Sequence, residues 1–283
     1  MMKKVLARST PAWLLLLVLA GPMPVVAQED KDNTGTNPVN FTYDFRLITE
    51  MQEFEGSAGS QVINTMEFRW PIGRDIANLK GPEGKDSLFY NMGTRIGMRF
   101  RARYQTLSLT TPGAEPFESS EVSGIGDFDM RILGLAYTSP KVLVAVGLEA
   151  FFDTASNEAL GSGHTLLGPQ VFVAFPGILG GRSLFIPGYQ YVFDVAGEGR
   201  VRRSQIDLYF VWLLAEGKNW LIVNPQIIYD HELSEDFATF ETEWGFMIVQ
   251  KYGISGYLRP GIGLTDPAPY SWNFEAGLKF VWR

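Results

Sequence analysis

The chain contains no cysteine and only two histidines among its 283 residues. The absence of cysteine excludes a disulfide framework, a lipid anchor on cysteine and any thiolate metal site. The two histidines, His164 and His231, lie far apart in the sequence, so we expect neither a metal site nor a cofactor. Acidic residues outnumber basic ones by 31 to 24, which argues against nucleic acid as a partner.

Long apolar runs are also scarce. The longest lies at residues 13–20, after a start that carries three basic residues, and it is followed by helix-breaking Gly21 and Pro22. This order is typical of a cleaved secretory signal, and the run is shorter than the roughly 20 residues that a membrane-spanning helix needs. We therefore expect a signal peptide over residues 1–27 and a flexible periplasmic lead-in over 28–38. The folded domain would then cover residues 39–283.

In this last segment, apolar and polar residues alternate with a period of two, which is the period of a β-strand. In the first run, for example, Phe41, Tyr43, Phe45 and Leu47 alternate with polar residues. About twelve such runs of roughly ten residues each are expected of an antiparallel up-and-down β-barrel in the outer membrane. The runs cover residues 41–47, 62–70, 92–104, 128–132, 142–152, 164–175, 185–194, 203–214, 221–230, 240–248, 252–262 and 272–282.

A soluble β-sandwich would alternate in the same way, but two further features favour a barrel in lipid. Aromatic residues stand at the ends of the apolar rows, as in the interfacial girdles of membrane barrels. They are Trp70, Tyr189, Tyr229, Tyr252, Trp272 and Trp282. The connections also alternate between short turns, such as Ser139-Pro140, and longer polar loops, such as 156–163. One connection, 73–87, is long where a short turn is expected.

The candidate functional residues are charged side chains on the polar, lumen-facing sides of the strands. Those expected to line a solute path are Arg95, Arg99, Arg101, Arg103, Arg46, Arg69, Arg131, Asp127, Asp129, Glu241, Glu243 and Glu275. Period two places the four arginines of residues 95–103 on one face, with Asp207, Asp230 and the glutamates on the opposite wall. Such walls select solutes in a narrow pore. Alternatively, Glu67, Asp127 and Asp129 neutralise the arginines, and cross-strand ion pairs close the lumen.

An enzymatic role is a third, minor reading, because some outer-membrane barrels are lipases. A serine hydrolase needs its nucleophile and its base within hydrogen-bond reach. His164 follows Gly161-Ser162-Gly163, and His231 follows Asp230 near Ser234, but no serine stands in a nucleophile motif. We therefore expect no enzyme.

Three stretches carry a family resemblance: Ser123-Gly124-Ile125-Gly126-Asp127-Phe128, Gly147-Leu148-Glu149-Ala150 with Leu160-Gly161-Ser162-Gly163, and the tail from Leu258 to Trp282. They resemble the outer-membrane transporters related to the meta-pathway phenol-degradation protein. The resemblance implies a barrel that takes up hydrophobic or aromatic compounds, and it brings no catalytic residues.

The expected function is therefore a passive channel or transporter for small solutes in the outer membrane of a Gram-negative bacterium. A non-conducting barrel with an ion-paired lumen is the alternative. The expected partners are outer-membrane lipid and lipopolysaccharide, a small-molecule solute, and the barrel assembly machinery. That machinery reads a final amphipathic strand with a terminal aromatic residue, which Phe280 and Trp282 resemble.

Overall fold

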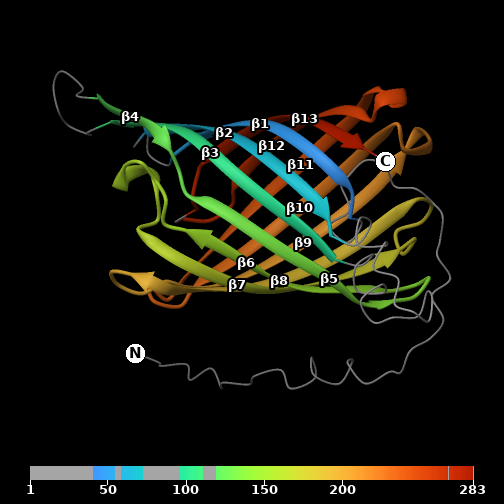
Figure 1. Ribbon diagram of the computed structural model, residues 1–283, viewed down its shortest axis with the longest axis horizontal. Coiled ribbons are helices and arrows are strands. Elements are labelled where there is room, and N and C mark those ends of the chain that lie inside the picture. The colour runs from blue at the N-terminus through green and yellow to red at the C-terminus, as the bar shows by residue number, and fades with distance from the viewer. Residues whose placement is uncertain (1–40, 55–58, 73–95, 111–118, 267, 283) are drawn as a thin grey trace, which may run out of the picture.

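A computed structural model describes residues 41–54, 59–72, 96–110, 119–266 and 268–282 of the chain. The expected signal peptide, lead-in and Arg95 lie outside these residues. The described part forms a β-barrel (Figure 1). Its strands are β1 (Tyr43–Glu53), β2 (Gly59–Pro71), β3 (Ile96–Thr110), β4 (Ser119–Ile125), β5 (Phe128–Thr138), β6 (Leu143–Phe152), β7 (His164–Pro176), β8 (Ser183–Gly197), β9 (Arg202–Leu214), β10 (Asn219–Asp230), β11 (Glu235–Val249), β12 (Ile254–Gly263) and β13 (Trp272–Trp282).

Except for β4 and β5, which do not pair with each other, neighbouring strands in the sequence pair antiparallel, and β1 pairs with β13 to close the barrel. The thirteen strands fill twelve positions, because β4 and β5 both pair with β3, one after the other. The interruption falls at Gly126 and Asp127. A Cβ atom at residue 126 would lie 2.1 Å from the Gln105 side-chain nitrogen, so this close approach favours glycine. The prediction of a twelve-stranded up-and-down barrel is thus confirmed.

The two sides of the strands differ in polarity, as the alternation predicts. Large apolar side chains are exposed on the outer side, among them Leu47, Met66, Leu148, Trp244 and Leu258. Buried charged side chains lie on the inner side, in the lumen, among them Asp44, Arg46, Glu67, Arg99, Asp129, Glu149, Glu243 and Lys279. The six predicted girdle aromatics are all exposed on the outside, at 39% to 64% of their surface. No helix in the described part of the chain is long and apolar enough to cross a membrane.

The connections define two ends of the barrel, which we call the turn end and the loop end. The turn end carries connections 139–142, 177–182, 215–218 and 250–253, of four to six residues, and β13 ends there. The loop end carries 153–163 and 264–271, of eleven and eight residues. It also carries 198–201 and 231–234, which have only four residues each because strands β8 to β11 are longer than expected. The predicted contrast in connection length is therefore wrong at these two places, and 73–87 lies outside the described residues.

An apolar cluster lies in the lumen at the turn end. It consists of Leu133, Ala145, Phe172, Ala174, Leu184, Ile186, Val211, Trp220, Ile222 and Tyr257, all at most 9% exposed. These residues meet because each of them lies on the lumen face of its strand, close to a turn-end connection. Phe41 packs against this cluster. The prediction that Phe41 shares the lipid-facing row of Tyr43 is therefore wrong, since β1 begins only at Tyr43.

Candidate functional site

The lumen contains a cavity of about 380 Å³ between the apolar cluster and the loop end. Every one of the twelve strand positions contributes to its wall, so the cavity is bordered by the whole circumference of the barrel. Contributions in strand order include Arg46, Glu67, Arg99, Arg131, Glu149, Gln170, Gln190, Asp207, Asn224, Glu243, Arg259 and Lys279. A volume of this size is typical of sites for small molecules.

One wall of the lumen contains an arginine–carboxylate network centred on Asp129 and Glu149. Arg101 Nε lies 2.9 Å from Asp129 Oδ1, and its Nη2 lies 3.1 Å from Glu149 Oε1. Arg99 pairs with the same two carboxylates, and Arg103 Nη2 lies 2.5 Å from Asp129 Oδ2. Two acids thus pair with three arginines, and Asp129 itself is completely buried. Of the acids expected to neutralise this arginine row, Asp129 is part of the network, the side chain of Asp127 is not, and Glu149 takes part although it was not expected to.

A second group on the same wall joins β1 and β2. Arg46 Nε lies 2.8 Å from Asp44 Oδ1 and 3.3 Å from Glu67 Oε1. Arg69 Nε lies 2.6 Å from Glu67 Oε1. Charge-assisted hydrogen bonds of this kind fix the positions of the guanidinium groups. The arginines therefore form an ordered wall.

The opposite wall is organised around Glu243 on β11. Its carboxylate accepts hydrogen bonds from Trp220 Nε1 at 2.6 Å, from Lys279 Nζ at 3.0 Å and from the Arg259 guanidinium. Arg259 Nη1 also lies 3.4 Å from Glu275 Oε1, and the Tyr257 hydroxyl donates a hydrogen bond to Glu275. Both cations of this wall are thus paired with glutamates.

Two carboxylates on this side have no cationic partner among the described residues. Asp207 on β9 accepts hydrogen bonds from the amides of Gln205, at 3.0 Å, and Gln226, at 2.7 Å. Glu241 on β11 accepts from Tyr270 Oη at 2.7 Å and from Asn273 Nδ2 at 3.0 Å. Neutral donors orient these carboxylates but leave their charge uncompensated.

The charges that line the cavity are distributed unevenly around it. On β1 to β6 there are five arginines, Arg46, Arg69, Arg99, Arg101 and Arg131, against two carboxylates, Glu67 and Glu149. On β9 to β13 there are four carboxylates, Asp207, Glu241, Glu243 and Glu275, against two cations, Arg259 and Lys279. A basic wall therefore faces an acidic wall, although most of the charges are also paired locally.

Three of the residues expected on the solute path, and Asp230 of the expected acidic wall, do not line the cavity. Asp127 accepts hydrogen bonds from the backbone N–H groups of Thr154, Ala155 and Ser162, so it anchors the 153–163 loop and does not line the lumen path. Its place in the break between β4 and β5 explains this difference. Asp230 caps the 231–234 connection and pairs with Arg203 at the loop end. Asp129 and Arg103 belong to the ion-pair network and do not line the cavity.

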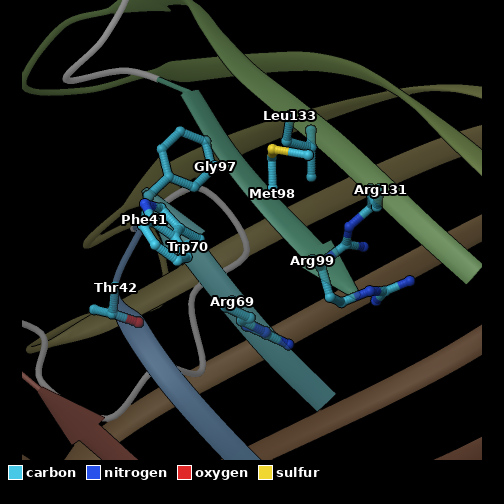
Figure 2. Close-up of a pocket in the computed structure, with 9 residues that line it drawn as sticks. All are labelled: Phe41, Thr42, Arg69, Trp70, Gly97, Met98, Arg99, Arg131 and Leu133. Carbon is cyan, nitrogen blue, oxygen red and sulfur yellow. The ribbon is translucent and has the colours of Figure 1, made fainter. Parts of the chain in front are cut away.

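A small pocket at the turn end lies between Phe41, which precedes β1, and the arginines of the basic wall (Figure 2). The Phe41 ring covers Gly97, where a Cβ atom would lie only 2.4 Å from Phe41 Cδ1. Beyond them, Figure 2 shows Arg69, Arg99 and Arg131 on three neighbouring strands. The pocket holds about 20 Å³, which is enough for a single water molecule.

The most important residues missed by sequence reasoning are the apolar ones of the lumen. Phe172, Ile186 and Trp220 belong to rows whose other members near the cavity are polar, such as Gln170 and Gln190. A single apolar residue in such a row carries no signal of its own. Only the convergence of ten of them near the turn-end connections reveals an apolar cluster in the lumen.

His231, one of the two histidines, has a serine and two aromatic rings beside it. His231 Nε2 lies 2.8 Å from Ser204 Oγ on the outer side of the barrel, next to the rings of Tyr191 and Tyr229. Within the described residues, no hydrogen bond reaches the other ring nitrogen of His231, so the orienting acid or amide of a catalytic triad is missing. In that same part of the chain, no group of three or more histidines, aspartates or glutamates is placed to hold a metal ion.

No family model matches the sequence, and no curated protein matches it. Solved structures do match the fold. An outer-membrane channel from Pseudomonas putida F1 is 9% identical, with 86% of this chain and 96% of that chain covered and a TM-score of 0.58. The KdgM porin is 7% identical, with 85% of this chain and 99% of that chain covered and a TM-score of 0.49. The NanC porin is 10% identical, with 85% of this chain and 99% of that chain covered and a TM-score of 0.47.

The likeness to the Pseudomonas putida channel shows the fold of an outer-membrane barrel. The apolar outer side and the exposed aromatic residues agree with this environment, since side chains there would otherwise face water. The chain is therefore a β-barrel of the Gram-negative outer membrane.

Proposed function

We propose that the chain is a non-enzymatic channel for the passive passage of small solutes across the outer membrane. The observation that carries this proposal is the cavity of about 380 Å³ that occupies the barrel lumen between a basic and an acidic wall. Charged walls of this kind orient and select solutes. By analogy with other barrels, the short connections of the turn end would face the periplasm and the loop end the exterior.

The resemblance to phenol-degradation transporters suggests hydrophobic or aromatic compounds as the solutes. The apolar cluster at the turn end supports this suggestion, because Phe172, Trp220 and Tyr257 offer apolar contacts to a solute that leaves the cavity. We also propose that the periphery of the barrel contacts lipid and lipopolysaccharide, and that β13, which ends in Trp282, is read by the assembly machinery.

A second candidate function is a non-conducting barrel with a structural or surface-binding role. The ion pairs around Asp129 and Glu149 and the apolar cluster favour it, because together they restrict the lumen from the wall and from one end. Barrels of eight strands are filled by side chains, whereas barrels of sixteen or more keep a channel, and twelve strands lie between these sizes.

Single-channel conductance in a planar bilayer under a salt gradient separates the two functions. The refolded wild type would be compared with Arg99→Ser/Arg101→Ser. We expect discrete conductance whose selectivity shifts towards cations in the variant, because two cations leave the wall of the path. The matched control is Arg202→Ser/Arg203→Ser, which removes two half-exposed arginines at the loop end. A silent barrel that still resists proteases and shifts on gels with heating would instead support the non-conducting role.

A further inference from the structure

Three arginines lie directly opposite one another on neighbouring strands of the basic wall. In the register of the barrel, Arg69 on β2 pairs with Arg99 on β3, which pairs with Arg131 on β5. Like charges directly opposite each other destabilise a sheet unless anions compensate them. Figure 2 shows the three side chains in this row, and all three line the cavity.

The arginine row is only partly compensated by the protein. Arg69 pairs with Glu67, and Arg99 pairs with Glu149 and Asp129. Arg131 is the exception. Although it stands opposite Glu149 in the register, no ion pair or hydrogen bond involves its guanidinium among the described residues. The half-buried Arg131 therefore presents to the cavity a positive charge that has no ion-pair partner among the described residues.

Across the cavity, the acidic wall presents the complementary feature. Asp207 and Glu241 line the same cavity and, within the described residues, are held only by neutral side chains. Neighbouring Glu243 and Glu275, in contrast, are paired with Arg259. One small volume therefore contains an unpaired guanidinium on one wall and two carboxylates without a cation on the other.

We propose that this cavity binds a small zwitterion, with its carboxylate at Arg131 and its ammonium group at Asp207 and Glu241. Uncompensated charges inside a protein are costly, and a ligand that carries both complementary charges removes the cost on both walls at once. An uncharged aromatic solute would leave both sets unpaired, and a simple anion would satisfy only the arginine. The inference rests on the proposed channel function, and it replaces the hydrophobic or aromatic solutes suggested there with a solute that carries both charges.

Binding of three probes with the same four-carbon chain tests the proposal: 4-aminobutanoate, butanoate and butylammonium. Saturation-transfer NMR of the refolded protein in detergent micelles would measure each affinity, with empty micelles as the blank. We expect the wild type to bind the zwitterion more tightly than either singly charged probe. Equal binding of butanoate and 4-aminobutanoate would overturn the proposal, because the site would then recognise only an anion.

Two charge-removing variants assign the two ends of the ligand. Arg131→Gln should weaken 4-aminobutanoate and butanoate by about tenfold or more, the worth of one charge-assisted hydrogen bond, and leave butylammonium unchanged. Asp207→Asn should weaken 4-aminobutanoate and butylammonium and leave butanoate unchanged. Arg203→Gln, at the loop end, is the matched control. Arg131→Lys keeps the charge and should retain binding, which guards against a mere folding defect. Unaltered affinity in both variants would refute the assignment.

Conductance of the same preparations keeps this inference distinct from the proposed function. A barrel that binds the zwitterion but carries no current would refute the channel and leave the ligand assignment intact. A barrel that conducts but shows no preference for the zwitterion would refute the ligand assignment and leave the channel intact.

Discussion

Lys279 Nζ lies 3.0 Å from Glu243 Oε1, and each of these side chains is only 1% exposed. The ammonium group also lies 4.9 Å from the Trp220 ring and 4.5 Å from the Tyr257 ring, at the edge of the apolar cluster. A charge this deeply buried is stable only while opposite charge lies close to it, because a buried charge that loses a partner is destabilising. The pair thus joins the charged cavity to the apolar cluster that borders it.

Replacing Lys279 with methionine should destabilise the barrel strongly. Breaking a buried ion pair costs about 3–5 kcal/mol, since Glu243 would lose one of its two cationic partners. Urea unfolding in micelles, followed by tryptophan fluorescence, would measure the loss in the free energy of unfolding. Lys251→Met, in the exposed 250–253 turn, should have little effect. If Lys279→Met is as stable as this control, the pair contributes nothing to stability.

Replacing Glu149 with glutamine should increase the selectivity of the channel for anions. Glu149 pairs with both Arg99 and Arg101, so its loss frees positive charge beside the cavity. Reversal potentials in a salt gradient would measure the change. Glu158→Gln, on the exposed 153–163 loop, removes the same charge away from the lumen and should leave the potential unchanged. A shift of equal size in both variants would contradict the assignment of Glu149 to the path.

Replacing Phe172 with alanine should widen the lumen at the apolar cluster and raise the unit conductance. The ring is 4% exposed within the cluster, so its removal opens space at the turn end, at a cost of about 3–5 kcal/mol in stability. Val171→Ala, on the outward-facing side of the same strand, is the control, and its unit conductance should match the wild type. An unchanged conductance in Phe172→Ala would show that the cluster does not limit the flow.

Replacing Leu148 with arginine should destabilise the barrel if this part of β6 faces lipid. Leu148 is 44% exposed on the outer side near the middle of β6. An arginine at the bilayer midplane costs about 2–4 kcal/mol, whereas near the interface it costs about 0–1 kcal/mol. Unfolding titrations in lipid vesicles would compare it with Leu233→Arg, in the loop-end connection 231–234, which should cost little. Equal costs at both positions would be incompatible with a lipid-facing β6.

The alternating pattern was sufficient to predict the strands and their faces. In β3, for example, Arg99 and Arg101 alternate with Phe100 and Ala102, and the structure places the two arginines in the lumen. Because the side-chain period of a strand is two, sequence parity alone decides the face. The break between β4 and β5 was not predictable in this way, since it lies where the pairing partner of β3 changes from one strand to the other.

The same reasoning could not predict which charges remain unpaired. Arg131 and Arg99 occupy equivalent positions in their rows, yet only Arg99 contacts Glu149. Side-chain pairing within the lumen depends on the stagger between strands and on distances across the barrel. Neither quantity is encoded in the period of a single strand.

The sequence by itself therefore determined that this chain forms a barrel of about twelve strands with an apolar exterior and a charged lumen, because both properties follow from local alternation. Only the tertiary structure decided that Asp127 anchors a loop and that Phe172 and Trp220 meet in an apolar cluster at the turn end. It also decided that Arg131 faces Asp207 and Glu241 around one cavity. These contacts join residues far apart in the chain, and their geometry arises only when the sheet closes.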